Sequence, residues 1–272
     1  MAGSPSTQGS MRRLRELRIR PNRELGQNFL VDANVLPVIG AAAELGERDT
    51  VLEVGGGLGV LSEYLAEHVE HVHVVEVDRR LEPALALATE RFANVALYWE
   101  DAMRTDLARL RPVPRKLVAN LPYGVATAVL LRTIDELPAL GVWVVMVQRE
   151  VGERMAATVG DTAYGSVSVR IAYFARAAVV GHVPASVFVP RPRVESVLVR
   201  VDRLPSPAVD PALVSYGRLE AVVKAGFGHR RKMLRRSLAG TVEPEAFVRA
   251  GVRPDARAEE LTVADWGRLA AL

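Results

Sequence analysis

The sequence predicts an α/β fold with a mostly parallel sheet, followed by a small C-terminal domain made only of helices. Short apolar runs alternate with helical patterns of about 10 to 15 residues, which is typical of a parallel sheet with helices on both faces. A glycine-rich turn at residues 55–59 joins the first run to its helix. Beyond residue 212 the apolar residues recur at helical spacing, and no strand pattern follows.

The elements of the sheet are expected in a simple order along the chain. Residues 24–45 end in a helical pattern for which Asp32 is a suitable N-cap. Further helices are expected directly after the glycine-rich turn, after residue 78 and after residue 124. The strands are expected at residues 50–54, 71–78, 94–101, 116–120 and 141–148.

Two further β-rich pieces, at about 177–183 and 196–202, predict an antiparallel hairpin at the edge of the sheet. Residues 204–211 (LPSPAVDP) have the composition of a linker. The predicted parts are a disordered basic arm at 1–23, an α/β domain at 24–203 and a helical domain at 204–272.

The composition restricts the chemistry of the chain. Among its 272 residues there is no cysteine, which excludes disulfides, thiolate metal sites and cysteine nucleophiles. His68, His71 and His73 come with no carboxylate cluster, so no metal site is expected. No apolar run approaches the roughly 20 residues that cross a bilayer, and the polar N-terminus does not resemble a signal peptide. We therefore expect a cytoplasmic protein with no membrane partner.

The charges of the chain are unevenly distributed, although the net charge is only +3. Residues 11–23 carry six arginines and one glutamate, and residues 224–236 carry six lysines and arginines and no acid. Two such runs in an otherwise balanced chain favour a polyanionic partner.

The glycine-rich turn distinguishes two classes of nucleoside cofactor. Glu53, Gly55, Gly57 and Gly59 match the E-x-G-x-G-x-G pattern of S-adenosylmethionine (SAM) methyltransferases. A nicotinamide dehydrogenase would have glycine at position 60, which is Val60 here. The turn therefore favours SAM.

Two carboxylates follow neighbouring strands of the predicted sheet. Glu76 comes 21 residues after Gly55, where an acid can accept hydrogen bonds from both hydroxyls of a ribose. Asp101 ends the next strand, and its carboxylate can accept a hydrogen bond from the amino group of an adenine. Ligands bind at the carboxyl ends of such strands, so both residues are expected in one cleft.

The motif NLPY at 120–123 follows another strand and predicts a methyl-acceptor site. The exocyclic amine of a nucleobase is a poor nucleophile because its lone pair is delocalised into the ring. Acceptors on both of its N–H bonds turn the lone pair toward an incoming methyl group. The Asn120 side-chain oxygen is one such acceptor, and the carbonyl of Leu121 or of Pro122 is the other. Tyr123 offers an aromatic face on which a flipped base can stack.

At this point the chain resembles the KsgA/RsmA family of rRNA adenine N6,N6-dimethyltransferases, and the resemblance covers essentially everything after residue 24. NLPY, the proline-rich FVPRPRVES and the late basic segment together are highly specific. The matching segments are LGQNFL (25–30), VLEVGGGLG (51–59), VEVD (75–78), EDAM (100–103), NLPY, VQREVGERM (147–155), YGSVSV (164–169), FVPRPRVES (188–196) and FGHRRKMLRRSL (227–238).

The resemblance implies a role for each matching position. The fold would be a Rossmann-like class I SAM methyltransferase with a helical RNA-binding domain. The Asn120 side chain would act in both cofactor binding and catalysis, and Tyr123 and Phe188 would sandwich the target adenine. The implied SAM-binding residues are Gln27, Asn28, Leu30, Gly55, Gly57, Glu76, Asp101 and Asn120, and the implied RNA-binding residues are Arg230, Arg231, Lys232 and Arg235.

The sequence departs from the family pattern at three positions. Gly56 stands where proline is usual, Glu100 stands where glycine is usual, and Met233 stands where threonine is usual. The change at Glu100 concerns the shape of the loop that carries Asp101.

The activity that the resemblance implies is dimethylation of N6 of two adjacent adenines in the 3′-terminal hairpin of 16S rRNA during ribosome biogenesis. The partner would be small-subunit rRNA in the immature 30S subunit, and the enzyme would be a monomer without a metal. One alternative is an Erm-type methyltransferase, which acts on large-subunit rRNA. Others are a non-catalytic RNA-binding or transcription factor of the same fold, and a dehydrogenase.

Overall fold

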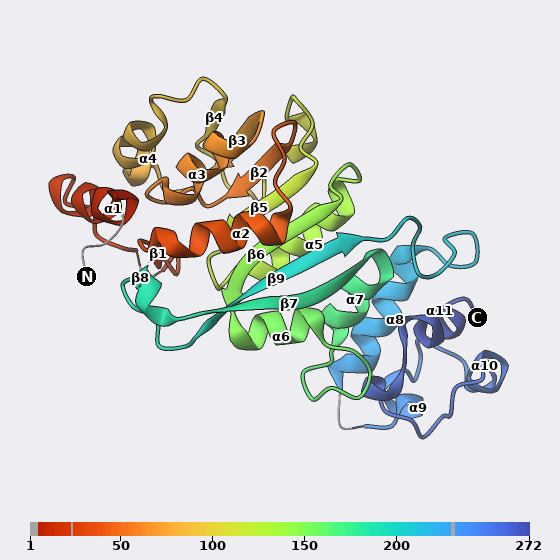
Figure 1. Ribbon diagram of the computed structural model, residues 1–272. Helices are drawn as coiled ribbons and strands as arrows, with labels where there is room; N and C mark the ends of the chain where they lie inside the picture. The colour runs from red at the N-terminus through yellow and green to blue at the C-terminus, as the bar shows by residue number, and fades with distance from the viewer. Residues whose placement is uncertain (1–4, 23, 230–231) are drawn as a thin grey trace. The chain divides into compact units, whose positions relative to one another are not determined.

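Seven strands form the central sheet of the computed structural model, which describes residues 5–22, 24–229 and 232–272 (Figure 1). Their order across the sheet is β4-β3-β2-β5-β6-β9-β7. The strands are β2 (Thr50–Val54), β3 (His71–Val75), β4 (Val95–Tyr98), β5 (Lys116–Asn120), β6 (Val142–Gln148), β7 (Ala175–Val183) and β9 (Ser196–Arg203).

The pairing confirms the predicted mostly parallel sheet. Strands β4, β3, β2, β5 and β6 pair in parallel, while β9 runs antiparallel to β6. Strands β7 and β9 are neighbours at the edge, as the predicted hairpin requires. Strands β3 and β4 are shorter than predicted, because residues 76–78 and 99–101 leave the sheet as the loops that carry Glu76 and Asp101.

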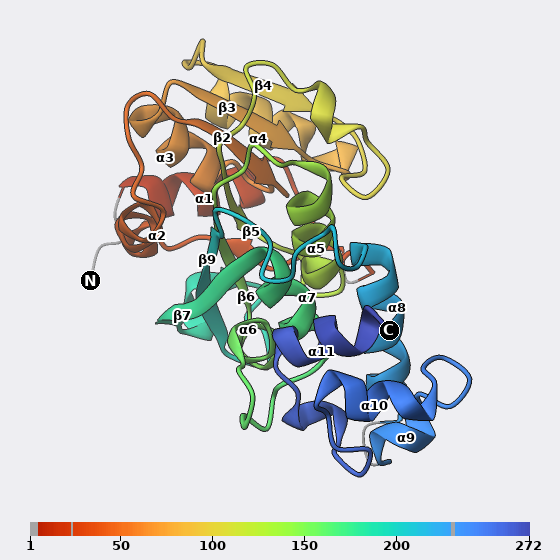
Figure 2. The same ribbon diagram turned by 90° about the vertical axis from the view of Figure 1, so that its right-hand side faces the viewer.

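Helices cover both faces of the sheet, with α2 (Leu36–Ala43) and α3 (Val60–His68) on one face and α5 (Ala126–Glu136) on the other (Figure 2). Helix α4 (Glu82–Thr89) packs beside α3. Asp32 caps the short 3-10 helix η1 (Ala33–Val35), which leads directly into α2, and accepts a hydrogen bond from the Asn34 N–H. Further 3-10 turns are η2 (Arg79–Leu81), η3 (Leu107–Arg109), η4 (Ala185–Val187) and η5 (Ala258–Glu260).

The chain divides into two units by its internal contacts. The first, called the catalytic unit below, comprises Met1–Gly152 and Ala178–Asp202, and the second comprises Glu153–Ala177 and Arg203–Leu272. Residues 153–177, which the sequence-based division assigned to the α/β domain, group here with the second unit. The reason is that Tyr164, Val169 and Tyr173 pack into the core of that unit.

The second unit contains helices and no strand of its own within described residues 204–272. Its core gathers around the buried side chains of Trp266 and Phe247. The helices here are α7 (Ser166–Phe174), α8 (Tyr216–Gly228), α9 (Leu234–Ser237), α10 (Pro244–Ala250) and α11 (Val263–Ala270), and α6 (Arg149–Ala156) spans the change between units. No described helix is both long and apolar enough to cross a membrane.

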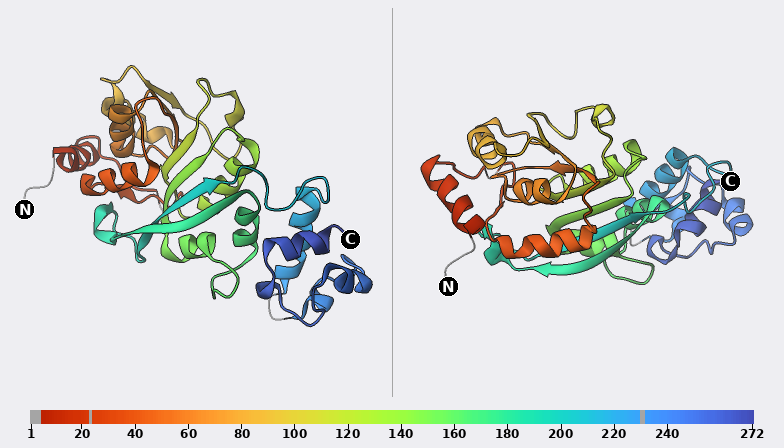
Figure 3. Two further views of the ribbon diagram at one scale, coloured as in Figure 1. Left: turned by 45° about the vertical axis from the view of Figure 1, so that its right-hand side comes forward. Right: turned by 45° about the horizontal axis from the view of Figure 1, so that its top comes forward.

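The N-terminal arm differs from the prediction of disorder, because Pro5–Glu16 forms a helix, α1, on the outside of the catalytic unit (Figure 3). Leu14 is buried in the hydrophobic core of this unit. The buried Arg13 guanidinium lies 2.6 Å from the carboxylate of Glu63 on α3. The sequence prediction of disorder rested on the charge pattern, which does not distinguish the buried Arg13 and Leu14 from the exposed arginines around them.

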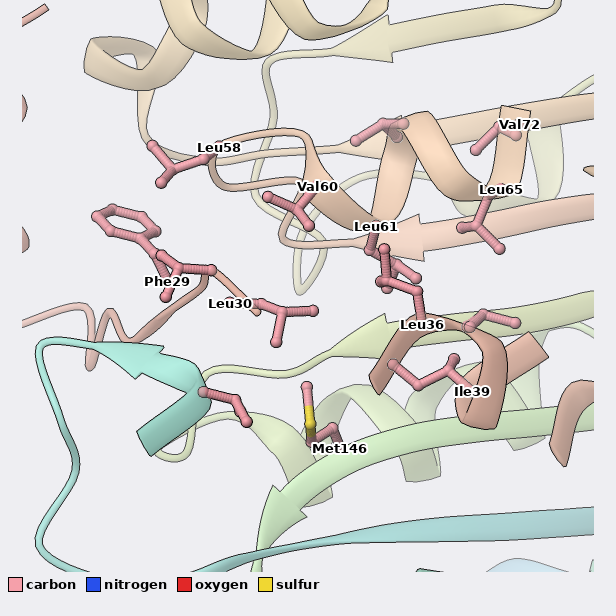
Figure 4. Packing of buried hydrophobic residues seen from close by; sticks show 14 of the residues in the cluster. Phe29, Leu30, Leu36, Ile39, Leu58, Val60, Leu61, Leu65, Val72 and Met146 are labelled. Atoms are coloured by element: carbon pink, nitrogen blue, oxygen red, sulfur yellow. The ribbon is translucent and has the colours of Figure 1, made fainter. Parts of the chain in front are cut away.

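The hydrophobic core of the catalytic unit extends to the glycine-rich turn (Figure 4). Phe29 and Leu30 form the short strand β1 (Phe29–Leu30), which pairs antiparallel with β8 (Phe188–Val189). The same cluster includes Leu58 and Met146, as Figure 4 shows. The turn between β2 and α3 therefore packs against the hydrophobic core through Leu58.

Gly59 tests how closely this turn is packed. It has a φ of 80°, and an added Cβ would lie 2.3 Å from the Cβ of Ala88. We expect Gly59→Ala to lower the free energy of unfolding by about 2–4 kcal/mol, since a left-handed residue and a core clash add. Urea denaturation measures the change. Gly141→Ala is the control, because an added Cβ there has no heavy atom within 4 Å; equal midpoints for both variants would contradict the packing.

Candidate active site

A cavity of about 480 Å³ opens at the carboxyl ends of the parallel strands, within the catalytic unit. Its volume lies in the range of about 300–1,000 Å³ that is usual for small-molecule sites. The sequence therefore placed the cleft at the correct edge of the sheet. The lining includes the predicted residues Gln27, Asn28, Leu30, Gly55, Gly57, Glu76, Asp101, Asn120, Leu121, Pro122 and Tyr123.

The glycine-rich turn brings the backbone of the cofactor loop against the NLPY segment. Gly55 has a φ of 84°, and its N–H donates to the Val75 carbonyl at 2.8 Å, which joins the ends of β2 and β3. A Cβ added at Gly55 would lie 3.6 Å from Cδ of Pro122. Because 3.6 Å is an ordinary van der Waals distance, glycine is needed here for the left-handed conformation and not for the approach of the two loops.

Glu76 is a buried acceptor in the wall of the cavity. Its carboxylate accepts hydrogen bonds from the N–H groups of Gly57, at 3.0 Å, and Asp78, at 2.8 Å. Burial raises the pKa of Glu76, and these two N–H donors act in the opposite direction by stabilising the ionised form. Each oxygen keeps a further lone pair, so the carboxylate fits the two hydroxyls of a ribose.

Glu53 is a second buried carboxyl in the lining, and the sequence reasoning gave it no role in the site. It is 1% exposed, and the Ser62 hydroxyl donates to it at 2.5 Å. Burial raises the pKa of Glu53 to about 8, assisted by the charge of Glu76. Glu53 therefore keeps its proton at neutral pH, and Glu76 is the better acceptor of the two. The first position of the E-x-G-x-G-x-G pattern was the signal for it.

Asp101 lies on the loop after β4. The same loop holds Glu100, which stands where the family usually has glycine. One oxygen of Asp101 accepts from the Met103 N–H at 2.8 Å, and the carboxylate lies 3.5 Å from the Arg104 guanidinium. Glu100 pairs with Arg109 at 2.5 Å and accepts from the Thr105 hydroxyl at 2.8 Å. These partners hold Glu100, so both residues stay in the lining of the cavity.

The segment before β1 is fixed to the cavity by side-chain amides. The Gln27 carboxamide donates to Asp78 at 2.8 Å and accepts from the Asn22 N–H at 2.7 Å. The Asn28 carbonyl accepts from Nδ2 of Asn120 at 3.2 Å. The lining residues of this segment are therefore held from both sides.

The NLPY segment presents two acceptors. Because Nδ2 of Asn120 is engaged by Asn28, its Oδ1 is the remaining acceptor, and no described residue donates to it. The Pro122 carbonyl accepts from the N–H groups of Val125 and Ala126, both at 3.1 Å, at the start of α5. No described residue donates to the Leu121 carbonyl. Of the two carbonyls that the sequence left open, the one at Leu121 is therefore available.

Tyr123 lines the cavity, but Phe188 does not. The Tyr123 hydroxyl lies 2.9 Å from the hydroxyl of Ser196, the fully buried first residue of β9. Phe188 is 2% exposed, belongs to the hydrophobic core and lies opposite Leu30 in the β1–β8 pair. The structure thus does not assemble the predicted aromatic sandwich, because core packing holds the Phe188 ring. It adds Ser196, the last residue of FVPRPRVES, as a partner of Tyr123.

Two of the predicted RNA-binding residues, Lys232 and Arg235, lie in the second unit. Lys232 precedes α9 and Arg235 lies in it, and both are exposed. Arg230 and Arg231 lie outside the described residues. An RNA-binding role for these four residues stays a prediction.

Two of the histidines that were considered as metal ligands, His71 and His73, lie on β3. His73 is buried and bonds to the Tyr98 hydroxyl, at 3.1 Å, and the Pro112 carbonyl, at 2.8 Å. No group of three or more metal-ligating side chains occurs within the described parts of the chain.

Comparison with known proteins decides the family. The family model described as "Ribosomal RNA adenine dimethylase" matches residues 18–272. The chain belongs to this family. Ribosomal RNA small subunit methyltransferase A of Acidothermus cellulolyticus is 43% identical over 264 residues, which cover 93% of this chain and 89% of that protein. The protein of the same name from Thermobifida fusca is 42% identical, over 97% of this chain and 94% of that protein.

Solved structures agree with the fold of this rRNA adenine dimethylase. A dimethyladenosine transferase from Plasmodium falciparum has a TM-score of 0.74 and 24% identity, over 87% of this chain and 94% of that chain. The 23S rRNA methyltransferase ErmE has a TM-score of 0.70 and 26% identity, over 89% and 98% of the two chains. The methyl donor of the family is SAM.

The raised pKa of Glu53 makes stability depend on pH. The unfolded chain releases this proton above about 4.5, whereas the folded dimethylase keeps it until about pH 8. The free energy of unfolding therefore falls as pH rises between these values, because the folded state binds more protons. We expect Glu53→Gln to remove a fall on the order of 4 kcal/mol. Urea denaturation from pH 5 to 9 measures it.

The control for this variant is Glu47→Gln, which removes an exposed carboxylate from the same unit. It should follow the wild-type pH profile. Parallel profiles for wild type and Glu53→Gln would show that Glu53 does not hold its proton.

The bond between Ser196 and Tyr123 predicts that both hydroxyls act together. Ser196→Ala and Tyr123→Phe should each lower kcat/KM for RNA by about 2- to 10-fold, the worth of one hydrogen bond. Both variants keep the aromatic face. The double variant should be no worse than either single one, because the partners are in contact. Methyl-transfer kinetics with Ser186→Ala, an exposed serine, as control test this, and additive losses would exclude the pairing.

Proposed function

We propose that this enzyme dimethylates N6 of two adjacent adenines in the 3′-terminal hairpin of small-subunit rRNA, in the immature 30S subunit. The observation that carries the proposal is the pair of acceptors, Oδ1 of Asn120 and the carbonyl of Leu121, beside a cleft that fits a nucleoside. We infer a cytoplasmic location, since assembling ribosomes are its substrate, and a monomer, as the resemblance to the family implies.

The residues of the cleft fit SAM. Glu76 is a buried carboxylate suited to a ribose diol, and the turn at Gly55 leaves backbone exposed to the cavity for the methionine portion. Asp101 and Met103 line the wall expected to receive the adenine of the cofactor. When bound, SAM supplies a methyl group on a sulfonium, which is electrophilic without further activation.

The residues of the chain act on the target amine by orienting it. Oδ1 of Asn120 and the Leu121 carbonyl accept its two N–H bonds, which turns the nitrogen lone pair out of the plane of the ring. The Tyr123 ring supports the base by stacking, and Ser196 holds that ring. Catalysis then rests on position and hydrogen bonding, and no strong base is required.

The choice of small-subunit rRNA rests on the relatives. The relatives at 42–43% identity are named small subunit methyltransferases, whereas the 23S enzyme ErmE is 26% identical. The segment 188–196 supports the same choice, since it matches the small-subunit family in the sequence. The Erm-type activity is therefore the alternative that the experiment must separate.

Asn120→Ala tests the orienting role. We expect methyl transfer to fall by at least about 100-fold, the usual loss for a group that acts in the transition state, with SAM binding still measurable. The bond to Asn28 is also lost, so a moderate decrease in SAM affinity is expected. Asn34→Ala, which removes an exposed carboxamide from the same unit, is the control. Near-normal turnover in Asn120→Ala would refute the role.

The substrate is tested with rRNA from cells with and without the gene. Mass spectrometry should find two adjacent N6,N6-dimethyladenosines near the 3′ end of small-subunit rRNA only when the gene is present. In vitro, immature 30S subunits should accept methyl groups and protein-free large-subunit rRNA should not. The reverse pattern would identify an Erm-type enzyme, and no transfer to either would identify a non-catalytic protein.

A further inference from the structure

The N-terminal helix α1 and the residues directly after it carry a cluster of exposed arginines on the catalytic unit. We propose that Arg12, Arg15, Arg18 and Arg20, called the arginine face below, bind phosphates of the substrate RNA outside the active-site cavity. This inference rests on the proposed function for the identity of the RNA. All of α1 precedes residue 18, where the match to the family model begins, while Arg18 and Arg20 lie within that match.

The arginine face is held by anchors on the other side of the helix. Arg13 is buried and lies 2.6 Å from the carboxylate of Glu63, which neutralises its charge within the protein. Leu14 is 8% exposed in the hydrophobic core, and Met11 packs against the same cluster. A charge run that merely solvated a flexible arm would need no such anchors. Arg13 therefore attaches the helix to the catalytic unit, whereas the arginines of the arginine face point to solvent.

The outer arginines have little internal compensation. The side chain of Arg12 is 71% exposed and 3.9 Å from Glu16, a pairing of little worth at the surface. Arg15, Arg18 and Arg20 are exposed and form no ion pair with any described residue. These exposed and largely unpaired positive charges fit a polyanionic partner. Each contact of an arginine with a nucleic-acid phosphate releases condensed counterions, which favours binding.

Arg18 occupies a backbone position that favours glycine. Its φ is 50°, and it follows α1 in a Schellman-type ending, with the Ile19 N–H bonded to the Leu14 carbonyl and the Arg18 N–H to the Arg15 carbonyl. A non-glycine residue is strained there, yet the position carries a long cationic side chain. Strain kept at an exposed position is a sign that the side chain itself is used.

The arginine face is also close to the cavity. Arg20 is four residues before Glu24, the first lining residue, so their Cα atoms are at most about 14 Å apart. Asn22, two residues after Arg20, donates its N–H to Gln27, another residue that lines the cavity. RNA next to a base in the cavity is therefore within reach of the Arg20 guanidinium group.

The test compares two double variants of the full-length enzyme. Arg15→Gln/Arg18→Gln removes two charges from the arginine face. Arg48→Gln/Arg115→Gln removes two exposed arginines that precede β2 and β5, at the opposite end of these strands from the cavity. The probe is unmethylated small-subunit rRNA, and its dissociation constant is measured from 50 to 300 mM KCl.

We expect the slope of log K against log salt to become shallower by about one per arginine removed from the face, and to stay unchanged in the control. KM for RNA should rise, with SAM affinity and kcat at saturating RNA unchanged. Arg18→Gly alone should make the slope shallower by about one without lowering the melting temperature, since glycine relieves the strain. This variant distinguishes the effect of losing the Arg18 side chain from the effect of disturbing α1.

Slopes equal to wild type in both face variants would overturn the proposal, as would equal changes in face and control variants. Loss of binding to anionic phosphatidylglycerol vesicles with an unchanged RNA slope would assign the face to lipid and overturn it too. Methylation of small-subunit rRNA by the wild-type enzyme is scored separately. If it occurs while the slopes stay equal, only the arginine face fails.

Discussion

The hydrogen bond from Nδ2 of Asn120 to the Asn28 carbonyl fixes the chemistry of the cavity. A carboxamide has a donor end and an acceptor end, and a rotation of the group by half a turn would exchange them. With the donor end held by backbone, the acceptor end is the one left for a substrate amine. The partner backbone is in turn held by the β1–β8 pair and by Gln27. Segments far apart in the sequence thus decide the orientation of one side chain.

The charges of the cavity follow from a division between two buried glutamates. A SAM cofactor is cationic at its sulfonium, and two ionised carboxylates in one dry wall would repel each other strongly. Glu53 avoids this because it keeps its proton and bonds to Ser62, whereas Glu76 receives two backbone N–H groups. Glu53, the first residue of the E-x-G-x-G-x-G pattern, is therefore neutral, and the negative charge of this wall comes from Glu76.

The sequence predicted the order of the strands along the chain and the residues at their carboxyl ends, because apolar periodicity and loop chemistry are local properties. It did not predict which carbonyl of NLPY is available. That depends on α5, whose first N–H groups use the Pro122 carbonyl. Phe188 was placed at the cavity by analogy, while its burial depends on the distant strand β1. Helix α1 was taken for disorder because the ion pair of Arg13 involves a residue fifty positions away.

Pro122 of NLPY contacts both α5 and the glycine-rich turn. Its carbonyl caps the start of α5, and its ring lies where a side chain at position 55 would extend. A Cβ at Gly55 would lie 3.6 Å from the proline ring, which is an ordinary van der Waals distance, so it is the φ of 84° and not the proline that favours glycine here. The two motifs, separated by more than sixty residues, lie against each other, and in the proposed function the distance between methyl donor and amine depends on this contact.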